Sequence, residues 1–416
     1  MNDKLSEMKE RLESLSSKQI TSMDASKKPT KRKLTAKISN SEEFPEERFH
    51  GLDFLRAMAM LMGLVFHAPM LYYIPIMADG FQEFGVSSAT IPLMEAWLNA
   101  TVQWLHSWRM TAFFMTSGFF AGLVLSKRTP KQFISDRFVK LGITMILFSA
   151  VFDMLDGRFE GKLEHMWFLY YLLLFSCIAW IISTLSSHSK SVTFKQNYKM
   201  ALTKLILISI ALVLVRPIFD HLDGGHVSVA THYHTINLGG LLYFLSWFCA
   251  GIWLYSNRFL LAAANSKALT FFSLICATGV FYFILPNLTG VFGFGATKME
   301  TQNDAIIFSL LKGLNAVLWA SFLTLITHQV MKKSNKILNW LVTLSFPIYI
   351  FHLLPCMVLS AILIGMGLSQ IQVLIGAVFG AFTVSVVLYY LLIKFTPLSW
   401  IILGYKKSWL QPFKKR

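Results

Sequence analysis

The sequence predicts an all-α, polytopic membrane protein with about ten transmembrane helices and both termini in the cytoplasm. Two observations support this fold class. The chain of 416 residues is 55% hydrophobic and only 14% charged, whereas a soluble domain carries about 25% charged residues. Its net charge of +16 comes from Lys and Arg that gather between alternate apolar runs, a pattern typical of membrane proteins rather than of nucleic-acid-binding domains.

Apolar runs long enough to cross a bilayer, about 20 residues each, define the predicted helices. The runs lie at 53–76, 97–126, 139–155, 165–186, 201–219, 237–256, 268–286, 306–329, 341–363 and 371–394, and the third is short. Loop 127–140 holds five Lys or Arg residues, whereas loops 77–96 and 364–370 hold none. The other loops keep this alternation, so the positive-inside rule places both termini in the cytoplasm and supports an even number of helices.

Three regions follow from the same patterns. Residues 1–48 are polar and lack the apolar stretch of about 7–15 residues that a cleavable signal peptide requires. They are also low in aromatic residues, so we expect a cytoplasmic tail that is disordered or loosely helical. Its basic cluster at 27–37 either lies against anionic lipid headgroups or is solvated. Residues 49–400 form the transmembrane domain, and residues 401–416 form a basic cytoplasmic C-terminal tail.

Ionisable residues within the spans are the candidate site, because a charge inside a bilayer costs several kcal/mol. In the first span Arg56 and His67 are eleven residues apart, which is close to three helical turns. They therefore share one face, roughly 16 Å apart along the axis, and both are candidate catalytic residues. His67 is either a general base, since histidine titrates near neutral pH, or a histidine paired with a backbone carbonyl or hydroxyl between helices.

The second span carries His106 and Arg109, which are three residues apart and therefore on one face. Arg109 lies well inside an apolar run and requires either an anionic ligand or a structural ion pair. We favour the ligand, because the nearest acidic residues, Asp53 and Glu95, are expected near opposite edges of the membrane. The Ser-Gly pair that begins at Ser117 lets another helix or a narrow ligand approach closely, so Ser117 is a candidate substrate-binding residue.

Further polar residues lie in later spans. His165 and Trp167 open the fourth span at its extracytoplasmic end, where Trp167 is equally typical of an interfacial aromatic belt. His352 lies mid-membrane in the ninth span between two prolines, which free backbone carbonyls and favour a cavity. We expect Arg216 and Lys312, each near the end of a span, to extend their charges to the interface.

The predicted extracytoplasmic loop 220–236 is rich in histidine, with residues His221, His226, His232 and His234. We expect these to be exposed loop histidines and expect no metal. A metal site is the alternative, although a His-Tyr-His sequence in a Gly-rich loop is a weak signal.

Four segments, in the same order along the chain, resemble the acyltransferase family 3 of integral membrane O-acyltransferases, and within it the glucans biosynthesis protein C branch. The matching motifs are Arg, ten residues and His (Arg56, His67), HS-aromatic-RM-x-x-FF-x-x-SG-aromatic-F (His106–Phe120), H-x-WFL (His165–Leu169) and IY-x-x-H (Ile348–His352). The family's Arg-x-x-Arg at the start of the third span is here Arg137 and Lys140. Charge is kept, but Lys loses the bidentate recognition of phosphate or carboxylate.

This resemblance implies an enzyme of the bacterial inner membrane that moves an acyl group, succinyl or acetyl, from cytoplasmic acyl-CoA to a hydroxyl of an extracytoplasmic glycan. In the most similar branch the glycan is a periplasmic glucan. The resemblance implies acyl-CoA as donor substrate and no metal. Arg137 and Lys140, together with Arg56, would hold the phosphates of the donor.

The same resemblance assigns roles inside the membrane. His67 would take the proton of the sugar hydroxyl or itself become acylated. Arg109 would stabilise the developing oxyanion or bind the free carboxylate of a dicarboxylic donor. The remaining candidates for substrate binding are His106, Ser117, His165, Trp167 and His352.

A transporter or flippase for a glycan or a small organic anion is the alternative function, because intramembrane Arg and His also serve permeases. Inverted repeats are common in transporters, and the two halves of this chain show no convincing repeat. We therefore favour the enzyme. A pure transporter would not consume acyl-CoA.

Overall fold

The computed structural model describes residues 49–404, apart from residues 156, 158–159, 187–197, 290–294, 297–300 and 334. The predicted N-terminal tail and residues 405–416 of the predicted C-terminal tail lie outside the described residues. The division of the chain at 48 and 400 therefore stays a prediction.

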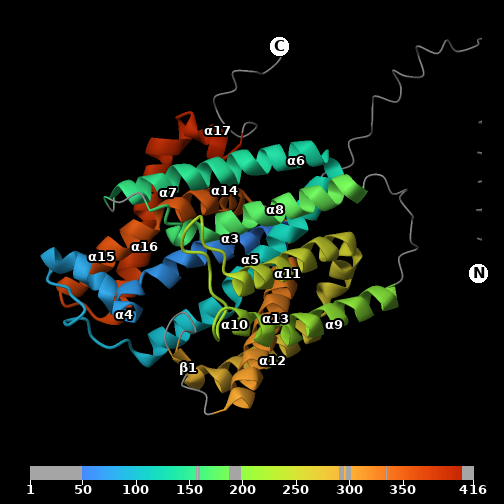
Figure 1. The fold of residues 1–416 in the computed structure, drawn as a ribbon, viewed down its shortest axis with the longest axis horizontal. Coiled ribbons are helices and arrows are strands. Elements are labelled where there is room, and N and C mark those ends of the chain that lie inside the picture. Colours follow the sequence, from blue (N-terminus) through green and yellow to red (C-terminus); the bar gives the residue numbers. More distant parts are fainter. Residues whose placement is uncertain are drawn as a thin grey trace, which may run out of the picture. The chain divides into compact units, whose positions relative to one another are not determined.

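Helices make up nearly all of the regular structure (Figure 1). In chain order the elements are α3 (His50–His67), α4 (Met70–Tyr73), η1 (Pro75–Phe84), α5 (Ala96–Lys127), α6 (Pro130–Arg137), η2 (Phe138–Ile143), α7 (Thr144–Leu155), η3 (Glu164–Met166), α8 (Trp167–Ser186), α9 (Tyr198–Leu214), α10 (Arg216–Leu222), α11 (Leu238–Ser256), η4 (Arg258–Asn265), α12 (Lys267–Ile284), η5 (Leu285–Asn287), β1 (Leu288–Thr289), β2 (Gly295–Ala296), α13 (Gln302–Val330), α14 (Lys336–Phe351), α15 (Leu353–Gly365), α16 (Gln370–Leu388), η6 (Tyr389–Lys394) and α17 (Leu398–Ile402). The two short strands pair antiparallel.

The helices confirm a multi-pass membrane architecture. Among the described residues, seven helices are long and apolar enough to cross a membrane, or eight if the bent pair α14 and α15 counts as one span. The runs at 53–76 and 139–155 are helical but are not among these spans. Helix α3 has 18 residues with ionisable groups near both ends, and α7 has 12 residues directly after η2. The count of ten and the cytoplasmic placement of both termini stay predictions.

Large apolar side chains cover the outer surface of the bundle. Among the most exposed are Phe379 of α16 (69%), Phe271 of α12 (65%) and Leu207 of α9 (58%). Apolar faces of this extent require lipid as their solvent, because a soluble protein rarely exposes large contiguous apolar patches. The exposed apolar side chains and the lengths of the helices therefore both indicate a membrane protein.

Helix α3 lies inside the bundle, packed against α5, α13 and α14 (Figure 1). Half of its residues are buried, among them Leu55, Ala59 and Leu64. At its start, a Cβ on Gly51 would lie 2.6 Å from the carbonyl oxygen of Thr327 in α13, so only glycine allows this approach. The close packing fixes the rotation of α3 and hence the direction in which His67 points at its end.

Helices α5 and α11 make the closest contact between two long helices. A Cβ on Gly118 of α5 would overlap the carbonyl oxygen of Phe248, and a Cβ on Gly251 of α11 would overlap the carbonyl oxygen of Met115. Small residues let helix backbones meet in this way in membrane proteins. The Ser-Gly pair of α5 therefore serves a helix contact, which is one of the two uses that the sequence predicts for it.

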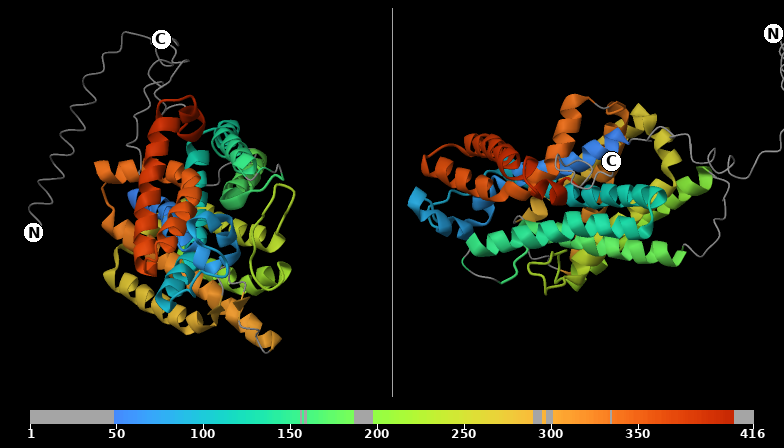
Figure 2. Two further views of the ribbon diagram at one scale, coloured as in Figure 1. Left: turned by 90° about the vertical axis from the view of Figure 1, so that its left-hand side faces the viewer. Right: turned by 90° about the horizontal axis from the view of Figure 1, so that it is seen from above.

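Helices α14 and α15 are bent by 69° relative to each other, and His352 lies at the break between them. Pro347 lies inside α14, and Pro355 follows in the first turn of α15. Since proline lacks a backbone N–H, Pro355 interrupts the hydrogen-bond ladder there. Helices α15, α16 and α4 gather at one end of the bundle (Figure 1; Figure 2, right).

Candidate functional site

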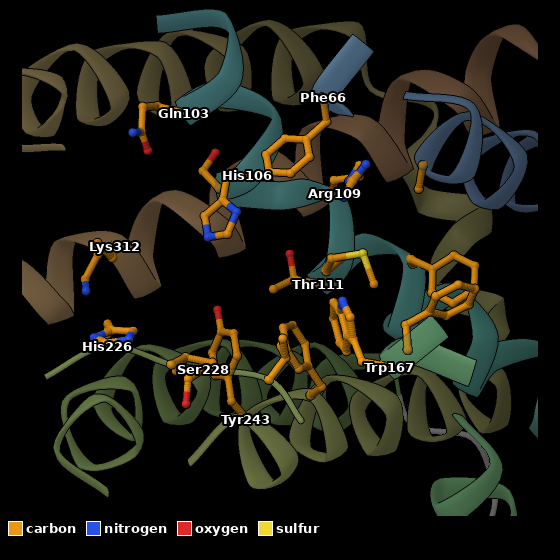
Figure 3. Close-up of a pocket in the computed structure, with 18 of the residues that line it drawn as sticks. Phe66, Gln103, His106, Arg109, Thr111, Trp167, His226, Ser228, Tyr243 and Lys312 are labelled. Atoms are coloured by element: carbon orange, nitrogen blue, oxygen red, sulfur yellow. The ribbon is translucent and has the colours of Figure 1, made fainter. Parts of the chain in front are cut away.

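A cavity of about 170 Å³ lies where α3, α5, α8, α10, α11 and α13 meet the break between α14 and α15 (Figure 3). Its walls combine aromatic rings with ionisable side chains, and the described residues that line it include no Asp or Glu. The sequence-predicted residues that line it are His67, His106, Arg109, His165, Trp167 and His352. The structure therefore brings together side chains from four separate motifs.

Three histidine rings form a cluster on one wall of the cavity. The ring centroids of His67 and His352 are 5.2 Å apart, and those of His165 and His352 are 5.4 Å apart. His67 comes from the end of α3, His165 from η3 before α8, and His352 from the break after α14. His352 thus meets α3 at the break, where a Cβ on Gly63 would lie 3.1 Å from its Nε2.

Backbone carbonyls orient two of the three rings. His352 Nδ1 lies 2.6 Å from the carbonyl oxygen of Tyr349, and His165 Nε2 lies 3.3 Å from that of Ile350. An imidazole N–H must donate to each carbonyl, which leaves His352 Nε2 and His165 Nδ1 as the acceptor nitrogens. The Tyr349 hydroxyl donates in turn to the carbonyl oxygen of His165 and ties the two segments together.

His67 differs from its two neighbours in its access to the cavity. His352 and His165 are buried, at 1% and 6% exposure, whereas His67 is only partly buried. Among the described residues its Nδ1 has no hydrogen-bond partner. The structure therefore does not pair this nitrogen with a backbone carbonyl or hydroxyl, which was the structural alternative predicted for His67.

Arg109 lies beside the histidine cluster without a carboxylate. Its guanidinium carbon is 4.5 Å from the centroid of the Phe66 ring, a cation–π contact. Within the described parts of the chain no Asp or Glu pairs with it, and its Nε has no hydrogen-bond partner. Gly63 makes room here, because a Cβ would lie 3.1 Å from His352 Nε2 and 3.2 Å from Arg109 Nη1. Arg109 is thus a cation that faces the cavity.

Aromatic side chains complete the walls of the cavity. The His106 ring stacks on Phe66 with centroids 5.9 Å apart, and its side chain is exposed towards the cavity. Trp167 contacts Phe244 and Tyr171 at centroid distances of 5.5 and 5.6 Å. It lies inside the bundle rather than in an interfacial belt. Such rings offer flat apolar faces to a ligand.

A second charged group lines another wall of the cavity. Arg216 Nε lies 3.0 Å from Asp220 Oδ1, and Lys312 Nζ lies 2.9 Å from Asp220 Oδ2. The expectation that both cations reach the interface is wrong, because a buried carboxylate lies within reach of each. The i,i+4 spacing of Arg216 and Asp220 is visible in the sequence, but Lys312 joins from a distant helix.

The histidine-rich loop contributes His226 to this second wall. His226 is half-buried rather than exposed, and burial, followed by the charge of Lys312, lowers the pKa of its ring below the usual value. The rings of His232 and His234 are 5.2 Å apart. Within the described residues no group of three or more His, Cys, Asp or Glu side chains is arranged to hold a metal ion.

Arg56 and Ser117 do not line the cavity. Arg56 Nη2 pairs with Asp53 Oδ1 at 3.0 Å, and its guanidinium lies 4.5 Å from the Phe120 ring. The shared face of Arg56 and His67 therefore does not place both in one cavity, because α3 separates them by most of its length. Ser117 is buried beside the contact between α5 and α11.

Arg137 and Lys140 lie outside the cavity as well. Arg137 ends α6 with its guanidinium 5.3 Å from the Phe133 ring, and Lys140 lies in η2 with its side chain against Gly404. Arg137 and Arg56 interact electrostatically, so the two cations are neighbours. The structure thus separates the predicted basic residues from the histidine cluster.

Comparisons with known proteins agree with the motifs. The family model described as an acyltransferase domain, that of acyltransferase family 3, matches residues 49–390. Similar curated proteins are the glucans biosynthesis protein C of Escherichia coli strain K12 and of Escherichia coli O1:K1 / APEC. Each is 27% identical over 193 residues, which cover 40% of this chain and 47% of the relative. The chain thus matches about half the length of these relatives, and no solved structure matches it.

Proposed function

This chain belongs to acyltransferase family 3, and from that membership we propose that it transfers an acyl group from cytoplasmic acyl-CoA to a hydroxyl of an extracytoplasmic glycan. The family gives its general class: it is a multi-pass membrane acyltransferase that transfers acyl groups other than aminoacyl groups. The donor, the acceptor, the bacterial inner membrane and the direction of transfer belong to the proposal.

The observation that carries the proposal is the meeting of His67, Arg109 and His352 around one buried cavity. Transfer to a hydroxyl requires a base for the proton and a positive group for the developing oxyanion. A partly accessible histidine lies beside an arginine that has no carboxylate partner among the residues the structure describes, and the two supply both groups. The name of the matched relatives supports a glucan as the acceptor.

In the proposed reaction the sugar oxygen attacks the carbonyl carbon of the thioester while its proton passes to the imidazole of His67. Arg109 stabilises the negative charge on the carbonyl oxygen. The carbon–sulfur bond then breaks, and the thiolate of coenzyme A takes the proton back from His67. His352, whose Nε2 faces the same space, positions the His67 ring from 5.2 Å away.

The donor nucleotide is assigned to the basic residues outside the cavity. Arg137 and Lys140, with Arg56 as a neighbour, form a cationic group that suits the phosphates of coenzyme A. The pantetheine arm is long enough to carry the thioester from there into the bilayer. His106, His165 and Trp167 then line the space for the acceptor.

The proposal is tested by replacing His67→Ala and measuring acylation of cell-envelope glycans by mass spectrometry. Acylation should fall by at least about 100-fold, the usual contribution of a general base, while the amount of protein in the membrane stays normal. His50→Ala is the matched control, because His50 opens the same helix but does not line the cavity. Retained acylation in the His67 variant would remove that residue from the chemistry.

A further inference from the structure

We propose that Arg216, Lys312 and Asn315 form an anion-binding subsite that holds a carboxylate or phosphate group of the substrate. This inference rests on the proposed acyl transfer and adds the class of substrate. It concerns the part of the cavity wall that Arg216, Lys312 and Asn315 line, where the sequence predicts only cations reaching towards the interface.

The first argument is that Asp220 does not neutralise this wall. Asp220 accepts four hydrogen bonds, from Arg216 Nε, Lys312 Nζ, the Ser309 hydroxyl at 2.6 Å and the Val227 N–H at 2.8 Å. Four donors use the whole acceptor capacity of a carboxylate. One carboxylate stands against two cations, so a net charge of +1 remains.

The second argument is which of these groups reaches the cavity. The Asp220 side chain is only 3% exposed and does not line the cavity, whereas Arg216 and Lys312 line it and keep 15% and 11% of their side-chain surface exposed. The Asp220 carboxylate therefore holds Arg216 and Lys312 from outside the cavity wall. Their positive charge faces the space where a substrate would bind.

The third argument is Asn315, a polar side chain that is completely buried. It lines the cavity three residues after Lys312, on the same face of α13. Neither its amide nitrogen nor its amide oxygen has a hydrogen-bond partner among the described residues. A buried amide without hydrogen-bond partners destabilises the protein by about 1–3 kcal/mol, so a ligand that hydrogen-bonds to Asn315 would remove this cost on binding.

The charges of the whole cavity favour the same ligand. Lys312, Arg216 and Arg109 all act electrostatically on His106. The His106 ring lies between Lys312 on one side and Arg109 on the other (Figure 3). The described residues that line the cavity include three permanent cations and no carboxylate. A low-dielectric space of this kind attracts anions and disfavours neutral analogues that leave the cations without a partner.

The anion has two chemical sources. One is the free carboxylate of a dicarboxylic acyl donor, whose thioester end would lie near Arg109 and His67. The other is an acidic substituent on the glycan acceptor. Both present planar or tetrahedral oxygen groups that Arg and Lys bind through charge-assisted hydrogen bonds.

Steady-state kinetics of the purified full-length protein in lipid nanodiscs separate these sources. Lys312→Gln is compared with wild type using succinyl-CoA or acetyl-CoA as donor, each with a neutral glucan oligosaccharide or its phosphorylated form as acceptor. We expect the KM of the anion-bearing substrate to rise at least about tenfold, as the loss of one charge-assisted contact implies, while the neutral pair changes less than about twofold. Lys312→Arg should restore the selectivity.

Lys394→Gln is the matched control, since Lys394 stacks over Tyr390 in η6 and does not line the cavity. Equal loss towards charged and neutral substrates, with a lower melting temperature, would overturn the inference and leave Lys312 as a brace between α10 and α13. An unchanged KM for every substrate would overturn it too.

A second measurement keeps the inference separate from the proposed reaction. The melting temperature of both proteins is recorded with sodium succinate and with inorganic phosphate, without any donor. We expect either anion to stabilise wild type more than Lys312→Gln. Equal stabilisation of wild type and Lys312→Gln would contradict the subsite. If the anions stabilise wild type more than Lys312→Gln, but wild type does not consume acyl-CoA, only the proposed reaction is contradicted.

Discussion

Gly63 offers a way to disturb the site without removing any of its functional groups. It lies in α3 one turn before His67, and alanine there would place a Cβ 3.1 Å from His352 Nε2 and 3.2 Å from Arg109 Nη1. Ordinary contacts begin at 3.4 Å, so both side chains must move by a few tenths of an ångström. The Gly63→Ala substitution therefore changes the relation between the histidine cluster and Arg109.

The expected effect on stability is small. Alanine is about 0.8–1.0 kcal/mol more favourable than glycine inside a helix. Each displaced side chain costs about 0.5–1.5 kcal/mol if its rotamer is strained. The two contributions oppose each other, so the free energy of unfolding should change by less than about 2 kcal/mol and the protein should remain folded.

The expected effect on turnover is much larger, because small misplacements of catalytic groups cost up to about 100-fold in rate. We expect the rate of thiol release from acyl-CoA, measured with a thiol reagent on purified protein with glucan acceptor, to fall about 10- to 100-fold. Gly279→Ala in α12 is the control, since nothing lies within 4 Å of its Cβ. This variant should keep full activity, and its free energy of unfolding should rise by about 1 kcal/mol. Wild-type turnover in Gly63→Ala would refute the view that the spacing of His352 and Arg109 matters.

Two further substitutions test the packing around the cavity. Gly118→Ala should sharply reduce the yield of folded protein extracted from the membrane, because its Cβ overlaps the backbone of α11 at Phe248; a normal yield and melting temperature would show that the helices separate easily. Asp220→Asn should destabilise the protein by about 3–5 kcal/mol, because Arg216 and Lys312 become buried charges without a counter-ion; thermal unfolding in nanodiscs measures this, and an unchanged melting temperature would contradict it.

Much of the fold and part of the site can be predicted from the sequence. Runs of apolar residues require lipid, so the helical multi-pass architecture follows from their length. His67, Arg109 and His352 stand out because ionisable groups are costly inside a bilayer, and the structure brings all three to one cavity. The four motifs also lead to the family that matches residues 49–390.

The remainder depends on tertiary structure that periodicity does not contain. Arg56 and His67 share a helical face, yet they lie near opposite ends of α3. Arg56 pairs with Asp53 near the start of the helix, whereas His67 lies at its end. Lys312 looks like a residue at the end of a span until α13 packs beside α10 and brings it to Asp220. Lys312 and Asp220 lie far apart in the chain, so spacing within a single helix cannot identify this pair.

The glycine contact between α5 and α11 has a mechanical consequence. Backbone meets backbone at Gly118 and Gly251, so neither helix can slide or rotate against the other without separating. His106 and Arg109 lie on α5, and Tyr243 lies on α11, so this part of the cavity wall is expected to be rigid. We therefore expect any movement that widens the cavity to occur on its other side, where α14 and α15 meet at a 69° bend beside His352.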